Sequence, residues 1–362
     1  MAYTNIDDPS AYFQVKLWTG NASTNAITLD GNSDMQPDFM WHKEQNDTNG
    51  WHQFDSSRGV TKYLACQSTA AEGTFGGYLS SFDSNGFTAN YGDSSMNSSS
   101  TNQCSWMWHC NGGTTSSNTD GTGITSTVQA NQDAGFSIVT YTGIGSGNAN
   151  PSVGHGLGVT PQVVLVKGRS QANSWIMYHY GIDGANSRNK YLILNSNGAA
   201  GTLANYWGTA ASGGVTSSTF GVYADNQSGN NYLNGTHVAY CFAEKQGYSK
   251  FGKYTGNANA NGAFVYTGFK PAFVLVKETN SATSWGIWDN KRSSSNVADK
   301  LLLPNSGDAE YTGSPYSLDF LSNGFKMRTT DGAWNGNGDS YIYMAFAENP
   351  FTTSTGVPCT AR

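Results

Sequence analysis

Short apolar runs alternate with polar turns along the whole chain, and the turns are rich in Gly, Asn and Ser. In the run HVAYCFAE, the bulky residues Val238, Tyr240 and Phe242 share one face, because successive side chains of a strand point to opposite sides. No window of about ten or more residues carries an apolar stripe of helical period. The pattern predicts an all-β protein of antiparallel β-sandwich domains, jelly-roll or lectin-like, with Gly/Asn/Ser-rich loops and few, short helices.

One order of patterns occurs three times: a proline, an apolar strand that ends in lysine, a polar turn and a tryptophan strand. The copies read PDFMWHKEQNDTNGWHQFD from Pro37, PQVVLVKGRSQANSWIMYH from Pro161 and PAFVLVKETNSATSWGIWD from Pro271. Each copy is followed by a lysine-led motif (KYLACQS, KYLILNS, KLLLPNS) and by a closing strand (SWMWHC, VAYCFAE, YMAFAE). Units of about 100 residues are domains and not the short repeats of a solenoid.

These motifs divide the chain into an N-terminal arm (1–12), three sandwich repeats (13–110, 136–245 and 250–350), a linker (111–135) and a C-terminal tail (351–362). The linker lacks apolar periodicity, Lys and Arg, which indicates a surface or flexible segment. Only a few residues separate the second repeat from the third. We therefore expect repeat 1 to be set apart from the other two. We expect the arm to be ordered by contact with another chain, because it is too short and polar to fold alone.

Composition excludes several classes of protein. Hydrophobic residues make up 37% and aromatic residues 13% of the chain, which is too much for a disordered chain. Charged residues make up only 12% and the net charge is −6, without a Lys/Arg cluster, so phosphate-backbone binding is not expected. No apolar run approaches the length of about 18 residues that spans a membrane. The first residues show no secretory signal, and the cysteines form no regular framework, which predicts synthesis in a reducing cytoplasm.

The residues that could act in catalysis or bind a metal form no recognisable catalytic motif. The six histidines belong to no motif, and the five cysteines have no metal-ligand spacing. Buried structural thiols are favoured, with a disulfide between Cys104 and Cys110 as the alternative. The segment from Asp225 to Gly235 has the Asp/Asn spacing of a weak calcium loop but lacks a closing bidentate acid, which favours a hairpin turn. We expect no enzyme activity, no metal and no cofactor.

Trp51, Trp175 and Trp285 occupy the same place in the three copies. A ring that recurs at equivalent positions favours a framework role, so we expect all three to be buried.

Aromatic residues outside the repeated set are better candidates for ligand contact. Tyr206, Trp207 and Trp334 lie in Gly/Asn-rich loops, where an exposed ring can stack on the C–H face of a sugar. Asp331 and Asn335 lie beside Trp334 and can bind sugar hydroxyls. These five residues are the predicted glycan contacts; the alternative is that they anchor loops or form a subunit interface.

Several motifs resemble a known family: NTDGTGITSTVQANQDAGFSIVTYTG, GHGLGVTPQVVLVK, HVAYCFAEKQGYSKFGKYTGN and AFAENPF look like the repeated domain of structural proteins from marine tailed bacteriophages. The resemblance covers nearly the whole chain. It implies a virion protein, described as a tail fibre or structural protein, with lectin-like sandwich units and no catalytic residues. The chain departs from that pattern at CSWMWHC, where a WCWK-like strand is common and His109 takes the place of the lysine.

The hypothesis that follows is a phage surface protein: a tail fibre, spike or knob component that attaches to host-surface glycan. The alternative is a capsid decoration or tail-assembly protein with purely structural contacts. A glycan-degrading enzyme is disfavoured, because no paired carboxylates recur in the repeats. The expected partners are other virion proteins, host glycan and further copies of the chain. With few charges and few lysines to protect edge strands, we expect a homo-oligomer, with a trimer as the first expectation.

Overall fold

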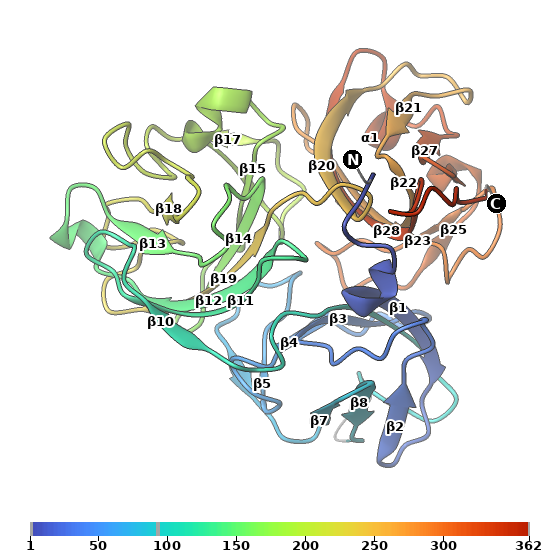
Figure 1. The fold of residues 1–362 in the computed structure, drawn as a ribbon, viewed down its shortest axis with the longest axis horizontal. Coiled ribbons are helices and arrows are strands. Elements are labelled where there is room, and N and C mark those ends of the chain that lie inside the picture. The colour runs from blue at the N-terminus through green and yellow to red at the C-terminus, as the bar shows by residue number, and fades with distance from the viewer. Residues whose placement is uncertain (1–2, 92–94, 361–362) are drawn as a thin grey trace.

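The computed structural model describes residues 3–91 and 95–360, which form three β-rich lobes around a common centre (Figure 1). Each lobe is one of the predicted repeats, and each contains a main antiparallel sheet with the same strand order. Repeat 1 has the order β1(Phe13–Thr19), β9(Asn102–Trp108), β3(Phe39–Glu44), β4(His52–Asp55). In repeat 2, the corresponding order is β12(Phe136–Thr142), β19(Thr236–Phe242), β14(Val163–Gly168), β15(Ile176–His179). Repeat 3 has β20(Ser249–Thr255), β28(Ser340–Pro350), β22(Phe269–Glu278), β23(Gly286–Asp289).

A smaller second sheet covers one face of each main sheet. Its strands are β2(Asn25–Thr28), β8(Gly86–Ala89) and β7(Leu79–Asp83) in repeat 1, β13(Ser152–Gly154) and β18(Thr219–Gly221) in repeat 2, and β21(Phe264–Tyr266), β27(Gly324–Met327) and β26(Leu318–Leu321) in repeat 3. Each repeat also carries an outer hairpin: β5(Lys62–Tyr63) with β6(Gly73–Thr74), β16(Lys190–Ile193) with β17(Gly201–Thr202), and β24(Lys300–Leu301) with β25(Tyr311–Thr312). The first strand of each repeat pairs with its closing strand, and the Trp strand stays in the main sheet.

Helices within the described residues are short, as the pattern predicted. They are η1(Pro9–Ala11), η2(Gly145–Gly147), η3(Gly184–Asn189), η4(Ser314–Tyr316) and α1(Gly332–Asn335). The all-β class predicted from the sequence is confirmed.

The segment predicted as a linker is part of the fold of repeat 2. It contains β10(Ser116–Asn118) and β11(Ser126–Asn131), which extend the main sheet beyond β12, with Val128 opposite Val139. The buried amide of Gln129 donates to the hydroxyls of Ser56 and Ser57 in repeat 1. Of the two alternatives predicted for 111–135, a surface segment or a flexible linker, the flexible linker is wrong. Small polar side chains that form hydrogen bonds across the repeat boundary leave no apolar periodicity in the sequence.

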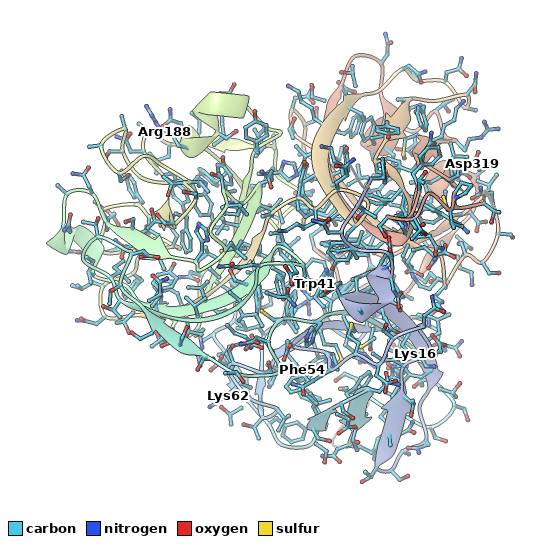
Figure 2. All side chains as sticks on the ribbon, in the orientation of Figure 1. Lys16, Trp41, Phe54, Lys62, Arg188 and Asp319 are labelled. Atoms are coloured by element: carbon cyan, nitrogen blue, oxygen red, sulfur yellow. The ribbon has the colours of Figure 1, made fainter. Side chains whose placement is uncertain are left out.

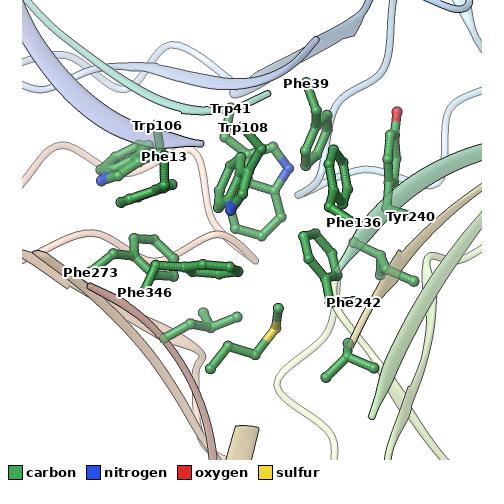
Figure 3. Packing of buried hydrophobic residues seen from close by; sticks show 14 of the residues in the cluster. Phe13, Phe39, Trp41, Trp106, Trp108, Phe136, Tyr240, Phe242, Phe273 and Phe346 are labelled. Carbon is green, nitrogen blue, oxygen red and sulfur yellow. The ribbon is translucent and has the colours of Figure 1, made fainter. Parts of the chain in front are cut away.

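The three main sheets turn their bulky faces toward one another and build a shared core (Figure 3). The ring of Phe39 stacks on Tyr240 of repeat 2 at 4.0 Å, and Phe13 stacks on Phe346 of repeat 3 at 5.1 Å. Trp108 contacts both neighbours, at 6.2 Å from Phe242 and 5.4 Å from Phe346. In Figure 2, Trp41 lies near the centre, where the three lobes meet, whereas Lys62 lies at the periphery of its lobe. The expectation that repeat 1 is set apart is wrong.

The opposite faces of the main sheets pack on the second sheets and form a separate core within each repeat. In β19, Val238, Tyr240 and Phe242 enter the shared core, while Ala239 and Cys241 face the core of repeat 2. The shared core is tightly packed, since the void at its centre is only about 10 Å³, room for about one water molecule. Each repeat is therefore a two-layer sandwich whose main sheet is buried on both faces. One face packs on the second sheet of the same repeat, and the other packs on the neighbouring repeats.

The recurring tryptophans join the repeats into a closed ring. Trp51, Trp175 and Trp285 are fully buried, which confirms the prediction. Each indole N–H donates to a carbonyl of the lysine-led motif in a neighbouring repeat. The pairs are Trp51 to Leu303 (3.1 Å) and Ser306 (2.8 Å), Trp175 to Ala65 (2.9 Å), and Trp285 to Ile193 and Ser196 (3.1 Å each). Because the three contacts run in the same direction, repeat 2 binds repeat 1, repeat 1 binds repeat 3 and repeat 3 binds repeat 2.

The N-terminal arm packs on its own chain. Thr4 donates its hydroxyl to the carbonyl of Gln246 (2.6 Å), between repeats 2 and 3, and Tyr3 donates to the carbonyl of Gly268 (2.6 Å). Asp7 accepts from the backbone N–H of Ser354 (2.6 Å) in the C-terminal tail. Contacts within the chain thus order the described part of the arm, contrary to the expectation that another chain does so.

Candidate functional site

Two of the predicted glycan contacts, Tyr206 and Trp207, are buried in the core of repeat 2. Trp207 is 0% exposed, and its indole N–H donates to the carbonyl of Lys190 at 2.9 Å. The ring of Tyr206 lies between Tyr191 (4.6 Å) and Tyr223 (5.8 Å). Neither ring offers a free face to a sugar, so the assignment of Tyr206 and Trp207 to glycan binding is corrected: their loop folds back onto the sheet and buries them.

Asn335 is also a structural residue. Its fully buried amide donates to the side-chain oxygen of Asn257 (3.0 Å) and to the carbonyls of Asn259 (2.9 Å) and Thr329 (2.8 Å). These bonds use both amide hydrogens to hold three loop segments together. The predicted role of Asn335 as a sugar contact is therefore wrong as well.

The remaining predicted residues, Asp331 and Trp334, line a solvent-open hollow of about 280 Å³ on repeat 3. The other lining residues come from the polar turn before β23, from the outer hairpin, from η4 and from α1: Thr283, Ser284, Leu301, Leu303, Tyr311, Tyr316 and Ala333. We call this feature the repeat 3 hollow. The loop composition pointed to Asp331 and Trp334. Tyr311 and Tyr316 were missed, because only the folded hairpin and η4 bring them to the same hollow as α1.

Half-buried tyrosine rings supply the accessible aromatic surface of the hollow. Tyr311 and Tyr316 lie with ring centroids 5.6 Å apart and ring planes at 60°. Trp334 is only 3% exposed and meets Trp288 edge to face at 5.0 Å, so it forms part of the floor. The hydroxyl of Tyr311 donates to Asp308 at 2.8 Å; this bond, together with burial, raises the pKa of Tyr311. The tyrosines, not the tryptophan, are available for stacking.

Asp331 provides the polar edge of the hollow. It is the N-cap of α1, and its Oδ1 accepts the backbone N–H of Ala333 at 2.8 Å. Among the described residues, its Oδ2 has no hydrogen-bond partner. The cap fixes the direction of the carboxylate and leaves one oxygen for an external donor.

The outer hairpins of repeats 1 and 2 share a tyrosine–glycine pair. Tyr63 lies opposite Gly73, and Tyr191 lies opposite Gly201. A Cβ on either glycine would fall 2.2 or 2.3 Å from the Cζ of the facing tyrosine, so the ring lies flat over the glycine. Tyr63 and Tyr191 then pack against further tyrosines of their own repeats, at 5.1 and 4.6 Å.

Repeat 3 reverses this pair. Leu301 stands at the tyrosine position and lies opposite Tyr311, which stands at the glycine position. The smaller leucine side chain lines the hollow, and the aromatic ring comes instead from the opposite strand. Repeat 3 therefore differs from its neighbours in the position that shapes this surface.

Three buried lysines at equivalent places are held by carbonyl groups. Lys43 donates to the carbonyls of Glu44 (2.7 Å) and Asp47 (2.8 Å), and Lys167 donates across the repeat boundary to the carbonyl of Thr69 (2.9 Å). Lys277 donates to the carbonyl of Glu278 at 2.6 Å. Burial lowers the pKa of all three amines to about 8. Since every amine donates to backbone carbonyls, these lysines hold the end of each strand in place and have a structural role.

Residues 3–91 and 95–360 contain no group of three or more His, Cys, Asp or Glu side chains that could hold a metal ion, and none of their helices has the length and hydrophobicity of a membrane span. In the segment considered as a calcium loop, Asn230 and Asn231 are buried and donate to the carbonyls of Tyr206 and Gly145. The cysteines are free thiols, and Cys104 and Cys110 are both buried without a disulfide.

Comparison with known proteins gives one family assignment. A family model described as "Domain of unknown function (DUF7483)" matches residues 8–350, and the chain belongs to this family. The match spans all three repeats as one domain, in agreement with the shared core. No curated protein and no solved structure matches the chain.

Proposed function

We propose that this member of the DUF7483 family is a surface component of a bacteriophage particle, in a tail fibre, spike or knob that attaches to host-surface glycan. The motifs that resemble structural proteins of marine tailed phages support the location on the virion. The observation that carries the proposal is the closed ring of repeats. A shared core and three same-direction indole contacts hold three sets of polar loops in one rigid frame.

A rigid frame suits recognition, because loops that are already ordered lose little conformational freedom when they bind. Serine, threonine, asparagine and backbone groups cover the loops in place of charged side chains, which make up only 12% of the chain. Such neutral donors and acceptors match the hydroxyl groups of a glycan. The buried ionisable groups described above are used between or within repeats and support a binding or structural role over catalysis.

A second candidate function is a capsid decoration or tail-assembly protein, and one surface favours it. Phe264 and Tyr266 lie on the edge strand β21 and are 48% and 54% exposed. The matching positions of β2 in repeat 1 are Ala26 and Thr28. Large exposed rings on a sheet edge are typical of a contact with another subunit. A homo-oligomer belongs to this second candidate; a trimer is not needed to close a ring, since the three repeats of one chain already form it.

The test is a pair of measurements on phage particles. An antibody fragment against the chain, viewed by cryo-electron microscopy, is expected to label the tail or its tip. Particles that lack the chain are expected to assemble and to lose adsorption to host cells. Labelling of the capsid with normal adsorption supports decoration, and absence of the chain from the particle contradicts both candidates.

A further inference from the structure

We infer that the repeat 3 hollow binds one neutral pyranose ring, a hexose or N-acetylhexosamine, at one site per chain. The inference rests on the proposed attachment to glycan and specifies where the sugar binds and which class of sugar is accepted. Four of the five residues predicted as glycan contacts are buried, and the two accessible rings of the hollow, Tyr311 and Tyr316, were not among those predicted.

The shape of the hollow suits a single sugar ring. Its volume of about 280 Å³ lies just below the range of roughly 300–1,000 Å³ that holds drug-sized molecules. It is open to solvent on one side, so a ring within a longer polysaccharide can enter without a free chain end. Tyr311 and Tyr316, at 60° to each other, offer apolar surface to the C–H face of a pyranose.

The polar groups favour a neutral sugar. Asp331 has one carboxylate oxygen in the α1 cap and a second oxygen available to accept a sugar hydroxyl. Thr283 and Ser284 place hydroxyl groups on the same hollow. An acidic sugar would bring a second carboxylate close to Asp331, and two like charges in a partly desolvated site repel each other. The site therefore discriminates against uronates.

The hairpin reversal limits the site to repeat 3. In repeats 1 and 2 the rings of Tyr63 and Tyr191 cover the facing glycine, and a leucine stands at that position only in repeat 3. Exchange of both hairpin residues removes the Tyr311 ring from the hollow and places a ring at position 301 instead. The double variant Leu301→Tyr with Tyr311→Gly gives repeat 3 the pair found in its neighbours and keeps residues that this hairpin geometry accepts.

The experiment measures binding of the purified full chain to an array of neutral hexose, N-acetylhexosamine and uronate oligosaccharides. The wild-type chain is expected to bind neutral members with a stoichiometry of one. The double variant is expected to lose at least about tenfold in affinity and to keep the wild-type circular dichroism spectrum. The matched control places the reversed pair in repeat 2 (Tyr191→Leu with Gly201→Tyr) and is expected to leave binding unchanged.

A second variant tests the carboxylate without disturbing the helix. In Asp331→Asn, the asparagine retains the N-cap, because Asn and Asp cap helices about equally well. The variant is expected to bind uronate oligosaccharides several-fold better than the wild type does, while neutral binding weakens. Unchanged selectivity would contradict the role of Asp331, even if the double variant failed to fold.

Outcomes separate the inference from the proposed function. If the wild-type chain binds no sugar on the array, or if the double variant binds as well as the wild type, the repeat 3 hollow is not the site. The particle measurements above are independent of this result. Surface location with loss of adsorption, combined with no array binding, would sustain the proposed function and overturn the inference.

Discussion

The side of each repeat that faces the shared core carries the same indole contact in all three copies, whereas the outer side differs in its hairpin pair. On the inner side, Trp51, Trp175 and Trp285 are all fully buried and all bond to the same motif of a neighbour. On the outer side, the hairpin pair is tyrosine–glycine in two repeats and is reversed at Leu301 and Tyr311 in the third. Each inner residue must match a second repeat, so a change there disturbs two repeats at once. The outer hairpin residues contact only their own repeat, so a change there leaves the other repeats intact and can create a binding surface.

The largest expected effect comes from separating the repeats. A fragment of residues 250–350 exposes Phe273, Met344 and Phe346, which are buried in the shared core of the full chain. We expect this fragment to be aggregated or molten, with weak near-ultraviolet circular dichroism, whereas the full chain melts in a single transition. A folded, monodisperse fragment would show that the repeats are independent domains and would remove the basis of the inner–outer comparison.

The next effect is the loss of one ring of the shared core. Trp175→Ala removes a fully buried side chain and its hydrogen bond to Ala65, and we expect it to lower the free energy of unfolding by about 3–5 kcal/mol. Denaturant titration measures the change. Since the ring joins repeats 1 and 2, the transition should shift as a whole. An early transition confined to repeat 2 would contradict the shared stability.

A buried ion pair offers a finer comparison between repeats 2 and 3. Asp289 pairs with Arg292, and Trp106 of repeat 1 donates to the same carboxylate at 3.1 Å. The matching residues of repeat 2 are His179 and Ile182, and His179 lies 3.1 Å from the carbonyl of Tyr343.

Arg292→Ile leaves Asp289 buried without its cation and is expected to cost about 3–5 kcal/mol. The double variant Asp289→His with Arg292→Ile, which copies repeat 2, is expected to recover part of this loss in the same denaturant titration. If the double variant is no more stable than Arg292→Ile alone, the two kinds of contact are not interchangeable in this ring.

The smallest effect is a dependence of stability on pH. Burial lowers the pKa of Lys43, Lys167 and Lys277 to about 8 from an ordinary value of 10.5. Between these values the unfolded chain binds protons that the folded chain has released, so stability rises with pH above about 8. Above pH 9 the buried thiols, such as Cys66, oppose this trend, because burial raises their pKa.

We therefore expect the urea midpoint to increase between pH 7.5 and 9, and a variant with all three lysines replaced by methionine to lose that increase. An equal slope in wild type and variant would show that other groups cause the pH dependence.

Particular residues show how far the sequence could be interpreted. The alternation in HVAYCFAE assigned Tyr240 and Phe242 correctly to one buried face, and recurrence identified the buried tryptophans. The failures lie where a segment folds back on another part of the chain. Loop composition suggested that Trp207 was exposed, but its contacts with Tyr178 and the carbonyl of Lys190 bury it. Likewise, the polar run that contains Gln129 belongs to the sheet because of partners in repeat 1.

The sequence by itself determined the strands, the three repeats and the two unlike faces of each closing strand, because these properties depend on side-chain size and on the period of two within a short segment. Only the tertiary structure decided what each face packs against. The bulky faces meet one another in a shared core, the supposed linker joins a sheet, and the repeat 3 hollow forms between a hairpin and α1. Each of these features joins residues that are far apart along the chain or belong to different repeats, and the choice among such contacts depends on how three folded surfaces fit together.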